Sequence, residues 1–99
     1  MKIQKIRKEE GYTVMSNYHF KDKRLSLKAK GLLSMMLSLS DNWNFSLIGL
    51  ASICVEGKDT IRKILNELKK YKYLKMVEKR DENGRFYYEY IIYEKPYEE

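Results

Sequence analysis

The sequence predicts a small α+β domain, with helices in the first two thirds of the chain and a β-hairpin in the last third. Between residues 27 and 71, apolar residues recur every three or four positions, which is the spacing of helices with one buried face. From residue 73 onward the period changes to two, and tyrosine, phenylalanine and isoleucine accumulate. An Asn83-Gly84 pair divides this last segment and favours a tight turn.

The length and composition bound the kind of protein. The chain has 99 residues, enough for one domain. Its single cysteine cannot form an internal disulfide, so nothing points to an oxidising compartment. No apolar run approaches the roughly 20 residues that span a bilayer, and the charged first ten residues lack the apolar stretch of a secretory signal. We expect a cytoplasmic protein with no membrane partner.

The first part of the chain is expected to contain a basic tail, a short strand and a polar connection. Residues 1–11 form the tail, and residues 12–15 form a β-prone run. This short N-terminal strand could pair with the hairpin or with an extended piece around Trp43. The polar stretch at residues 16–24 carries His19, which we expect at the surface or as a cap.

Three helices are predicted next. The first spans residues 27–39 and begins at Ser26, whose hydroxyl can accept a hydrogen bond from the first turn. The second begins at Ser46. The third runs from residue 58 to about 71 and follows Gly57, where the chain can turn between two helices. Each helix has one apolar face, so all three can share a core.

The last third reads as two strands, residues 73–81 and 85–93, around a turn at residues 82–84. The alternation places Phe86, Tyr88, Tyr90 and Ile92 on one face, and Tyr87, Glu89, Ile91 and Tyr93 on the other. Packing of the sheet against the helices is the preferred explanation for these aromatic residues. Stacking on single-stranded bases and an exposed protein–protein surface are the alternatives. Residues 94–99 read as a C-terminal tail or the start of a linker, which leaves residues 12–93 as the domain.

A helix–turn–helix followed by a two-stranded hairpin is the winged-helix arrangement. The sequence thus predicts a three-helix core with a C-terminal β-hairpin wing and a short N-terminal strand. Catalysis is not expected, because the single His19 and the single Cys54 have no partners for a metal site or a nucleophilic dyad. Cys54 lies on an apolar helical stripe and is expected in the core. No cofactor or metal is predicted, since the five glycines are scattered and form no phosphate-binding loop.

The charge distribution favours a polyanionic partner. The chain has 20 basic and 14 acidic residues and a net charge of +6. Residues 21–30 hold five basic residues against one acid, whereas residues 73–99 are net acidic. A basic domain with this asymmetry suits nucleic acid.

The candidate contacts lie on three parts of the chain. The polar face of the third helix would place basic and amide side chains near base edges or phosphates of the major groove; these are Lys58, Thr60, Arg62, Lys63 and Asn66. The alternative is a solvated helix face with Asp59–Lys63 and Glu67–Tyr71 as neighbours. Basic residues at the start of the first helix, Lys28 and Lys30, could position phosphates. The hairpin tip adds Lys79, Arg80, Asn83 and Arg85, although Asp81 and Glu82 oppose the same phosphates.

Residues 12–39, 42–74 and 78–96 resemble the N-terminal winged-helix domain of replication-initiation proteins. These proteins, called replisome organisers, RepA-like or DnaD-like, belong to phages, plasmids and integrative elements of low-GC Gram-positive bacteria. The most specific segments are residues 25–31, 57–62 and 80–85. The resemblance implies DNA binding, a recognition helix at residues 58–71, a wing at residues 79–86, a linker with a second domain downstream, and possible self-association.

We therefore expect a domain that binds double-stranded DNA at a replication origin or operator of a mobile element. One alternative is a protein-interaction module that forms a homodimer or docks a replisome protein, which the acidic C-terminal third and the tyrosine-rich hairpin favour. Another is a transcriptional regulator on the same fold.

Overall fold

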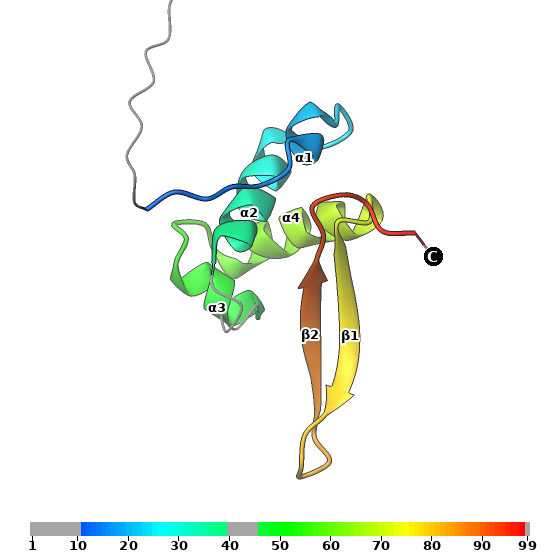
Figure 1. Ribbon diagram of the computed structural model, residues 1–99. Helices are drawn as coiled ribbons and strands as arrows, with labels where there is room; N and C mark the ends of the chain where they lie inside the picture. The colour runs from blue at the N-terminus through cyan, green and yellow to red at the C-terminus, as the bar shows by residue number, and fades with distance from the viewer. Residues whose placement is uncertain (1–10, 40–45, 99) are drawn as a thin grey trace, which may run out of the picture.

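Four helices and one antiparallel hairpin make up the chain in the computed structural model, which describes residues 11–39 and 46–98 (Figure 1). In chain order they are α1 (Tyr18–Lys21), α2 (Leu27–Ser38), α3 (Leu47–Ser52), α4 (Lys58–Lys70), β1 (Leu74–Arg80) and β2 (Phe86–Ile92). The predicted α+β class is confirmed. The expectation of only three helices is wrong, because α1 forms within the stretch that we expected to be a polar connection.

Both predicted serine caps are present. The Ser26 hydroxyl accepts a hydrogen bond from the Ala29 amide at 3.1 Å, and the Ser46 hydroxyl accepts one from the Gly49 amide at 2.9 Å. The first turn of α2 contains no acidic residue. Glu67 of α4 provides the negative charge there, since its carboxylate accepts hydrogen bonds from the Ser26 amide at 2.7 Å and the Ser26 hydroxyl at 2.8 Å.

Helix α4 ends in a Schellman motif. The Tyr73 amide donates to the Leu68 carbonyl at 2.9 Å, and the Lys72 amide donates to the Lys69 carbonyl at 3.1 Å. Lys72 has a φ of 67°, the left-handed conformation that glycine adopts most readily at this position. This reversal turns the chain directly from α4 into β1.

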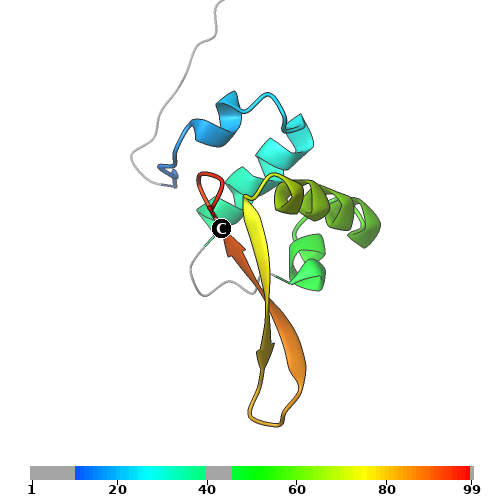
Figure 2. The same ribbon diagram turned by 90° about the vertical axis from the view of Figure 1, so that its right-hand side faces the viewer.

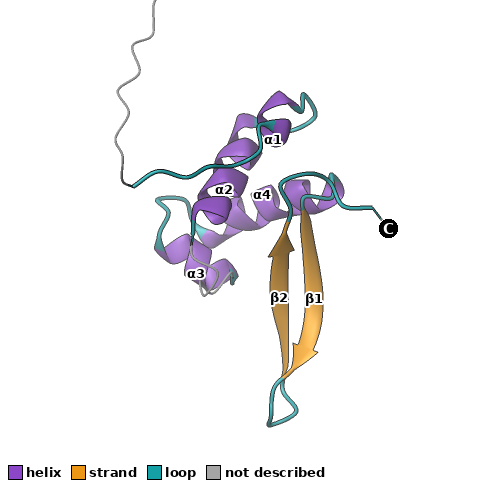
Figure 3. Ribbon diagram, in the orientation of Figure 1, coloured by secondary structure: helices purple, strands orange, loops and turns teal. Residues whose placement is uncertain are grey.

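The hairpin projects from the helices as a separate arm, which Figures 2 and 3 show from two sides. Its register pairs Leu74 with Ile92 at the base and Arg80 with Phe86 at the far end. The turn differs from a two-residue Asn-Gly turn: only Gly84 has a positive φ, 76°, and the Asp81 amide donates to the Arg85 carbonyl at 2.9 Å. This is the pattern of a three-residue loop with glycine in the left-handed position.

The core lies between α2, α3, α4 and the base of the hairpin. Its buried hydrophobic residues are Leu25, Ala29, Leu32, Leu33, Met36, Leu50, Ile61, Ile64, Leu65, Leu68, Tyr73 and Leu74. Tyr90 and Ile92 of β2 pack against this cluster, whereas the outer half of the hairpin does not. The core therefore fixes α4 and the hairpin relative to each other while leaving one side of α4 in solvent.

The predicted N-terminal strand at residues 12–15 is absent. These residues have no regular secondary structure, and Val14 is 85% exposed. In the described part of the chain, β1 and β2 form a sheet of two strands. β-Prone residues form a strand only where a partner strand is available, and this segment lies against neither edge of the hairpin. The extended piece predicted around Trp43 lies outside the described residues.

The expectation that His19 lies at the surface or acts as a cap is also wrong, since this side chain of α1 is completely buried. Its Nε2 lies 2.8 Å from the Ser34 hydroxyl, and that hydroxyl donates to the Lys30 carbonyl at 2.7 Å. Nε2 must therefore be the donor, so in the neutral ring Nδ1 carries no proton; it has no hydrogen-bond partner among the described residues. Burial lowers the pKa of this imidazole, with Lys30 acting in the same direction and Glu94 opposing.

A polar link joins the α1–α2 connection to the junction of α4 and β1. The Tyr73 hydroxyl donates to Asp22 Oδ2 at 2.7 Å, and the Arg24 guanidinium donates to both carboxylate oxygens, at 3.0 and 2.8 Å. The Asp22 side chain is only 7% exposed. The hydrogen bond from Arg24 is the main reason that the pKa of Asp22 lies well below its usual range, and burial raises the pKa of Tyr73.

The residues after β2 turn back along the start of β1. The Tyr93 amide donates to the Tyr73 carbonyl at 3.0 Å, and the Tyr97 amide donates to the Lys72 carbonyl at 2.9 Å. The Tyr97 ring packs against Tyr93 at a tilt of 40°, with centroids 5.0 Å apart. The chain thus leaves the hairpin at its base, on the side where α4 ends (Figure 1).

Candidate nucleic-acid interface

The outward face of α4 is opposite its buried stripe. The apolar residues Ile61, Ile64, Leu65 and Leu68 define the buried side, so the 100° step of the helix places Asp59, Lys63, Asn66 and Lys70 on the far side. All four of these far-side residues are exposed. α4 is 13 residues long, or about 20 Å, which suits a helix that lies along a DNA groove.

The predicted α4 contacts divide into two groups. Lys58, Arg62, Lys63 and Asn66 are exposed, whereas Thr60 is half-buried. Thr60 lines a crevice of about 300 Å³ between α2 and the start of α4, together with Lys28 and Gly31. The structure therefore brings Thr60 and Lys28 together, but on the α2 side of α4 and away from the outward face.

Both acidic residues of α4 already have partners. The Asp59 carboxylate pairs with Arg62 at 2.8 Å, and the Glu67 carboxylate binds Ser26. Neither contact is the i,i+4 pair of a solvated face that we had considered. Four lysines of α4 have no ion pair within residues 11–39 and 46–98: Lys58, Lys63, Lys69 and Lys70. The exposed surface of α4 is therefore dominated by positive charge.

Lys28 and Lys30 lie on opposite sides of α2. Ala29, between them, is in the core, so each lysine falls about 100° to one side of the buried stripe. Lys28 lies beside α4, whereas Lys30 is half-buried on the side of His19. Of the two, only Lys28 can extend the surface of α4.

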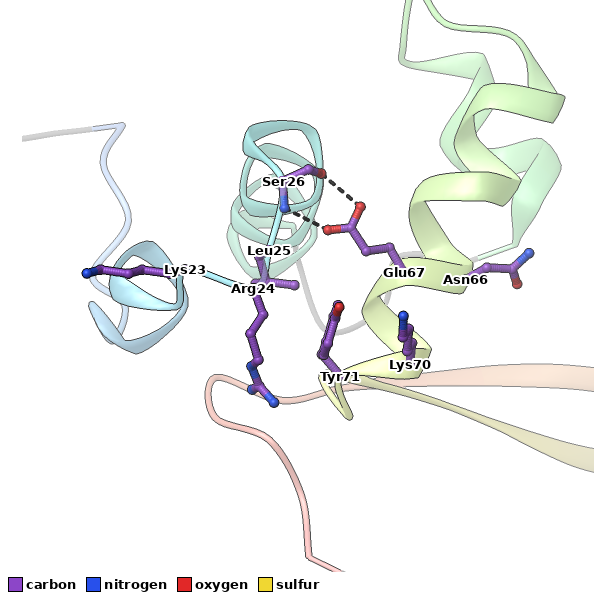
Figure 4. A pocket seen from close by; sticks show the side chains of 8 residues that line it. All are labelled: Lys23, Arg24, Leu25, Ser26, Asn66, Glu67, Lys70 and Tyr71. Carbon is purple, nitrogen blue, oxygen red and sulfur yellow. Dashed lines mark hydrogen bonds between the residues drawn. The ribbon is translucent and has the colours of Figure 1, made fainter.

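A hollow at the C-terminal end of α4 adds basic residues that the sequence reasoning did not select (Figure 4). The Arg24 guanidinium carbon lies 4.9 Å from the centroid of the Tyr71 ring, and Lys70 Nζ lies 5.3 Å from it. Lys23 lines the same hollow, which opens to solvent. The excess of basic residues at positions 21–30 is the sequence signal that points to this hollow, but Lys23 points away from Arg24 and Lys70 (Figure 4), and Arg24 is already bound to Asp22.

The basic residues near the hairpin tip do not form one cluster. Lys79 and Arg80 are neighbours on a strand, so their side chains lie on opposite faces. Lys79 Nζ is 3.8 Å from Glu89, and the Arg80 guanidinium lies 4.5 Å from the centroid of Phe86. Asn83 and Arg85 are exposed, and their backbone amides both donate to Asp81 Oδ1 at 2.9 Å.

Packing does not explain the aromatic residues of the outer hairpin, contrary to the preferred interpretation of the sequence. Phe86, Tyr87 and Tyr88 are 58%, 48% and 59% exposed. The explanation holds for Tyr90 and Ile92, which contact the core. The outer and inner aromatic residues differ because the hairpin extends past the helices, so only its base can pack against the core (Figure 2).

Cys54 packs at the edge of the core and is half-buried, close to its expected position. Burial raises the pKa of its thiol, so the reactive thiolate is disfavoured. Within the described ranges, no group of histidine, cysteine or acidic side chains could hold a metal ion.

The helices of the described part are all too short or too polar to cross a bilayer. Comparisons of the chain with protein-family models, curated proteins and solved structures find no match in any of the three.

Proposed function

We propose that this protein is a winged-helix domain that binds double-stranded DNA, with α4 in the major groove and the β1–β2 hairpin as the wing. The observation that carries the proposal is the charge of α4. Both of its acidic side chains are engaged within the protein, while Lys58, Lys63, Lys69 and Lys70 face solvent. Neutralisation of phosphates by such lysines is the main source of affinity for DNA.

The arrangement of elements supports the same proposal. α3 and α4 are joined by the five-residue turn at residues 53–57, and α2 packs across α4. The hairpin follows α4 directly through the reversal at Lys72. In this scheme α2, α3 and α4 are the three helices of the winged helix, and α1, which carries the buried His19, is an addition to them.

The test is fluorescence anisotropy of the 99-residue chain with a labelled random duplex at several salt concentrations. An interface that neutralises about four phosphates loses roughly a hundredfold in affinity between 50 and 200 mM salt. Lys63→Ala should lower affinity and reduce the slope of log K against log salt by about one.

Lys21→Ala is the matched control, since Lys21 is an exposed lysine at the end of α1, remote from α4 in sequence and outside the proposed interface. It should leave both affinity and slope unchanged. Equal effects of the two substitutions would show that binding is not localised to α4. Absence of duplex binding at 50 mM salt would refute the proposal.

The resemblance to replisome organisers suggests the setting: initiation of replication of a phage or mobile element, in the cytoplasm. A transcriptional regulator would use the same interface. The second candidate function is a protein-interaction module that forms a homodimer or docks a replisome protein, which the exposed aromatic residues of the hairpin favour. Light scattering of the free chain tests self-association directly.

A further inference from the structure

The outer half of the hairpin exposes aromatic rings on the same face that covers the core at its base. Side chains two residues apart on a strand lie on one face. Ile92 and Tyr90 pack against the core, and Tyr88 and Phe86 continue that face outward into solvent. We call Tyr88 and Phe86 the aromatic face.

The spacing of the two rings suits a ligand made of repeated planar units. Alternate residues on a strand are about 7 Å apart, so the two rings form successive steps along the arm. Both are more than half exposed, and the Arg80 guanidinium lies over one side of the Phe86 ring. Large aromatic side chains grouped in this way on a projecting arm indicate a binding surface.

Positive charge borders this face at both ends, and Glu78, opposite Tyr88, is the one acidic residue of the paired strands on it. Arg80 lies opposite Phe86 across the hairpin, with its guanidinium 4.5 Å from the ring centroid. At the base, Arg62 of α4 is close enough for its charge to act on Tyr90, where it opposes the rise in the pKa that burial causes. Lys58 and Lys69 lie on the same side of α4 as Arg62, by the 100° step of the helix. The basic side of α4 thus lies at the base of the arm, and Arg80 supplies a cation beside the outer rings.

We propose that the aromatic face binds unpaired bases of single-stranded DNA, stacked on Phe86 and Tyr88, while the strand continues past the base of the arm along the basic side of α4. Exposed aromatic rings on a sheet with cations along the backbone path are the combination that single-strand binding surfaces use. The choice of DNA over RNA rests on the proposed function. Single-strand binding by these rings is a different activity from the proposed duplex binding, because each base in a duplex is already stacked on its neighbours and cannot stack on a side chain.

A docked protein is the competing occupant of these rings. The observations favour nucleic acid, because the Arg80 guanidinium lies beside Phe86 and α4, at the base of the arm, carries lysines with no ion pair in the described part of the chain.

The experiment uses the full chain and two labelled oligonucleotides of about ten nucleotides, one of thymidines and one abasic with the same number of phosphates. The variants are Phe86→Ala and Tyr88→Ala. Tyr87→Ala is the matched control, because Tyr87 is a similarly exposed neighbour on the opposite face of the hairpin. Thermal melts followed by circular dichroism check that each variant is folded, and the random duplex is titrated in parallel.

The chain should bind the thymidine strand more tightly than the abasic strand. Phe86→Ala and Tyr88→Ala should each weaken binding to the thymidine strand by about five- to a hundredfold. Tyr87→Ala should change it by less than twofold, and binding to the abasic strand should change little in any variant.

Equal affinity for the two oligonucleotides, or equal effects of Tyr87→Ala and Phe86→Ala, would overturn the inference. So would a change in oligomeric state in Phe86→Ala with single-strand affinity intact, since that outcome assigns the rings to a protein contact. Duplex binding without single-strand binding would remove this inference and leave the proposed function standing. Single-strand binding without duplex binding would refute the proposed function and leave this inference standing.

Discussion

At the scale of single residues, the unusual position is His19. A buried imidazole with one unpartnered nitrogen can accept a second proton only at the expense of stability, because the new N–H group would have no acceptor. The chain has one histidine, so its contribution to the pH dependence of stability can be isolated.

The free energy of unfolding should fall as the pH drops below about 6.5. Because the folded pKa of His19 is lowered, the unfolded chain takes up a proton in this range and the folded chain does not. Stability from this group is therefore complete above pH 6.5 and declines below it. Urea denaturation between pH 5.5 and 7.5 would measure the slope, and His19→Gln should flatten it. An equally steep slope in that variant would assign the effect to other groups.

At the scale of elements, the end of α4 determines where the hairpin points. The Schellman motif places Lys72, a residue with a Cβ atom, in the left-handed region, which costs about 1 kcal/mol relative to glycine. The Lys72 ammonium also lies 5.3 Å from the centroid of Tyr97, so the side chain contributes contacts of its own. Two substitutions that shorten the Lys72 side chain separate the backbone's contribution to stability from that of these side-chain contacts.

Lys72→Gly should be more stable than Lys72→Ala by about 0.5–1 kcal/mol, because both variants lack the lysine contacts and only alanine retains the conformational strain. Chemical denaturation of the two variants measures the difference. Equal stability would mean that the turn relaxes out of the left-handed conformation.

At the scale of the whole molecule, stability depends on links between distant parts of the chain. The hydrogen bond from Tyr73 to Asp22 spans 51 residues and joins the α1–α2 connection to the base of the hairpin. Tyr73→Phe should lower the free energy of unfolding by about 1.5–3 kcal/mol, the usual contribution of a buried hydrogen bond to a charged group.

Tyr71→Phe is the control for this prediction, since no hydrogen bond from the Tyr71 hydroxyl is present in the described part of the chain. Tyr71→Phe should leave the free energy of unfolding nearly unchanged. The stability supplied by the lowered pKa of Asp22 is present above about pH 4 and lost as the pH falls further, so the difference between Tyr73→Phe and the parent chain should shrink in acid.

The sequence predicts the elements with strong local signals and misses those that depend on tertiary contacts. α2, α3 and α4 and both strands lie within about two residues of their predicted starts, because serine caps, apolar stripes and the period of two are local patterns. α1 was missed because four residues carry too little periodicity, and the strand at residues 12–15 failed because its partner was assumed.

The candidate site shows the same division. Exposure of Lys63 and Asn66 follows from helical spacing alone. The positions of Thr60 against α2, of Glu67 on Ser26 and of Arg24 over Tyr71 depend on how α2 crosses α4, which no local pattern encodes. Whether helices cover the aromatic rings of the hairpin depends likewise on how far the hairpin extends beyond the helices.

The return of the C-terminal segment has a practical consequence for studying this molecule. The bond from Tyr97 to the Lys72 carbonyl holds the chain at the base of the hairpin, with the turn at Gly84 at the opposite end of the arm (Figure 1). A fluorophore or surface tether attached after residue 98 would therefore sit away from the outer hairpin. The molecule can be immobilised by that end with its arm pointing into solution, free to meet whatever it binds.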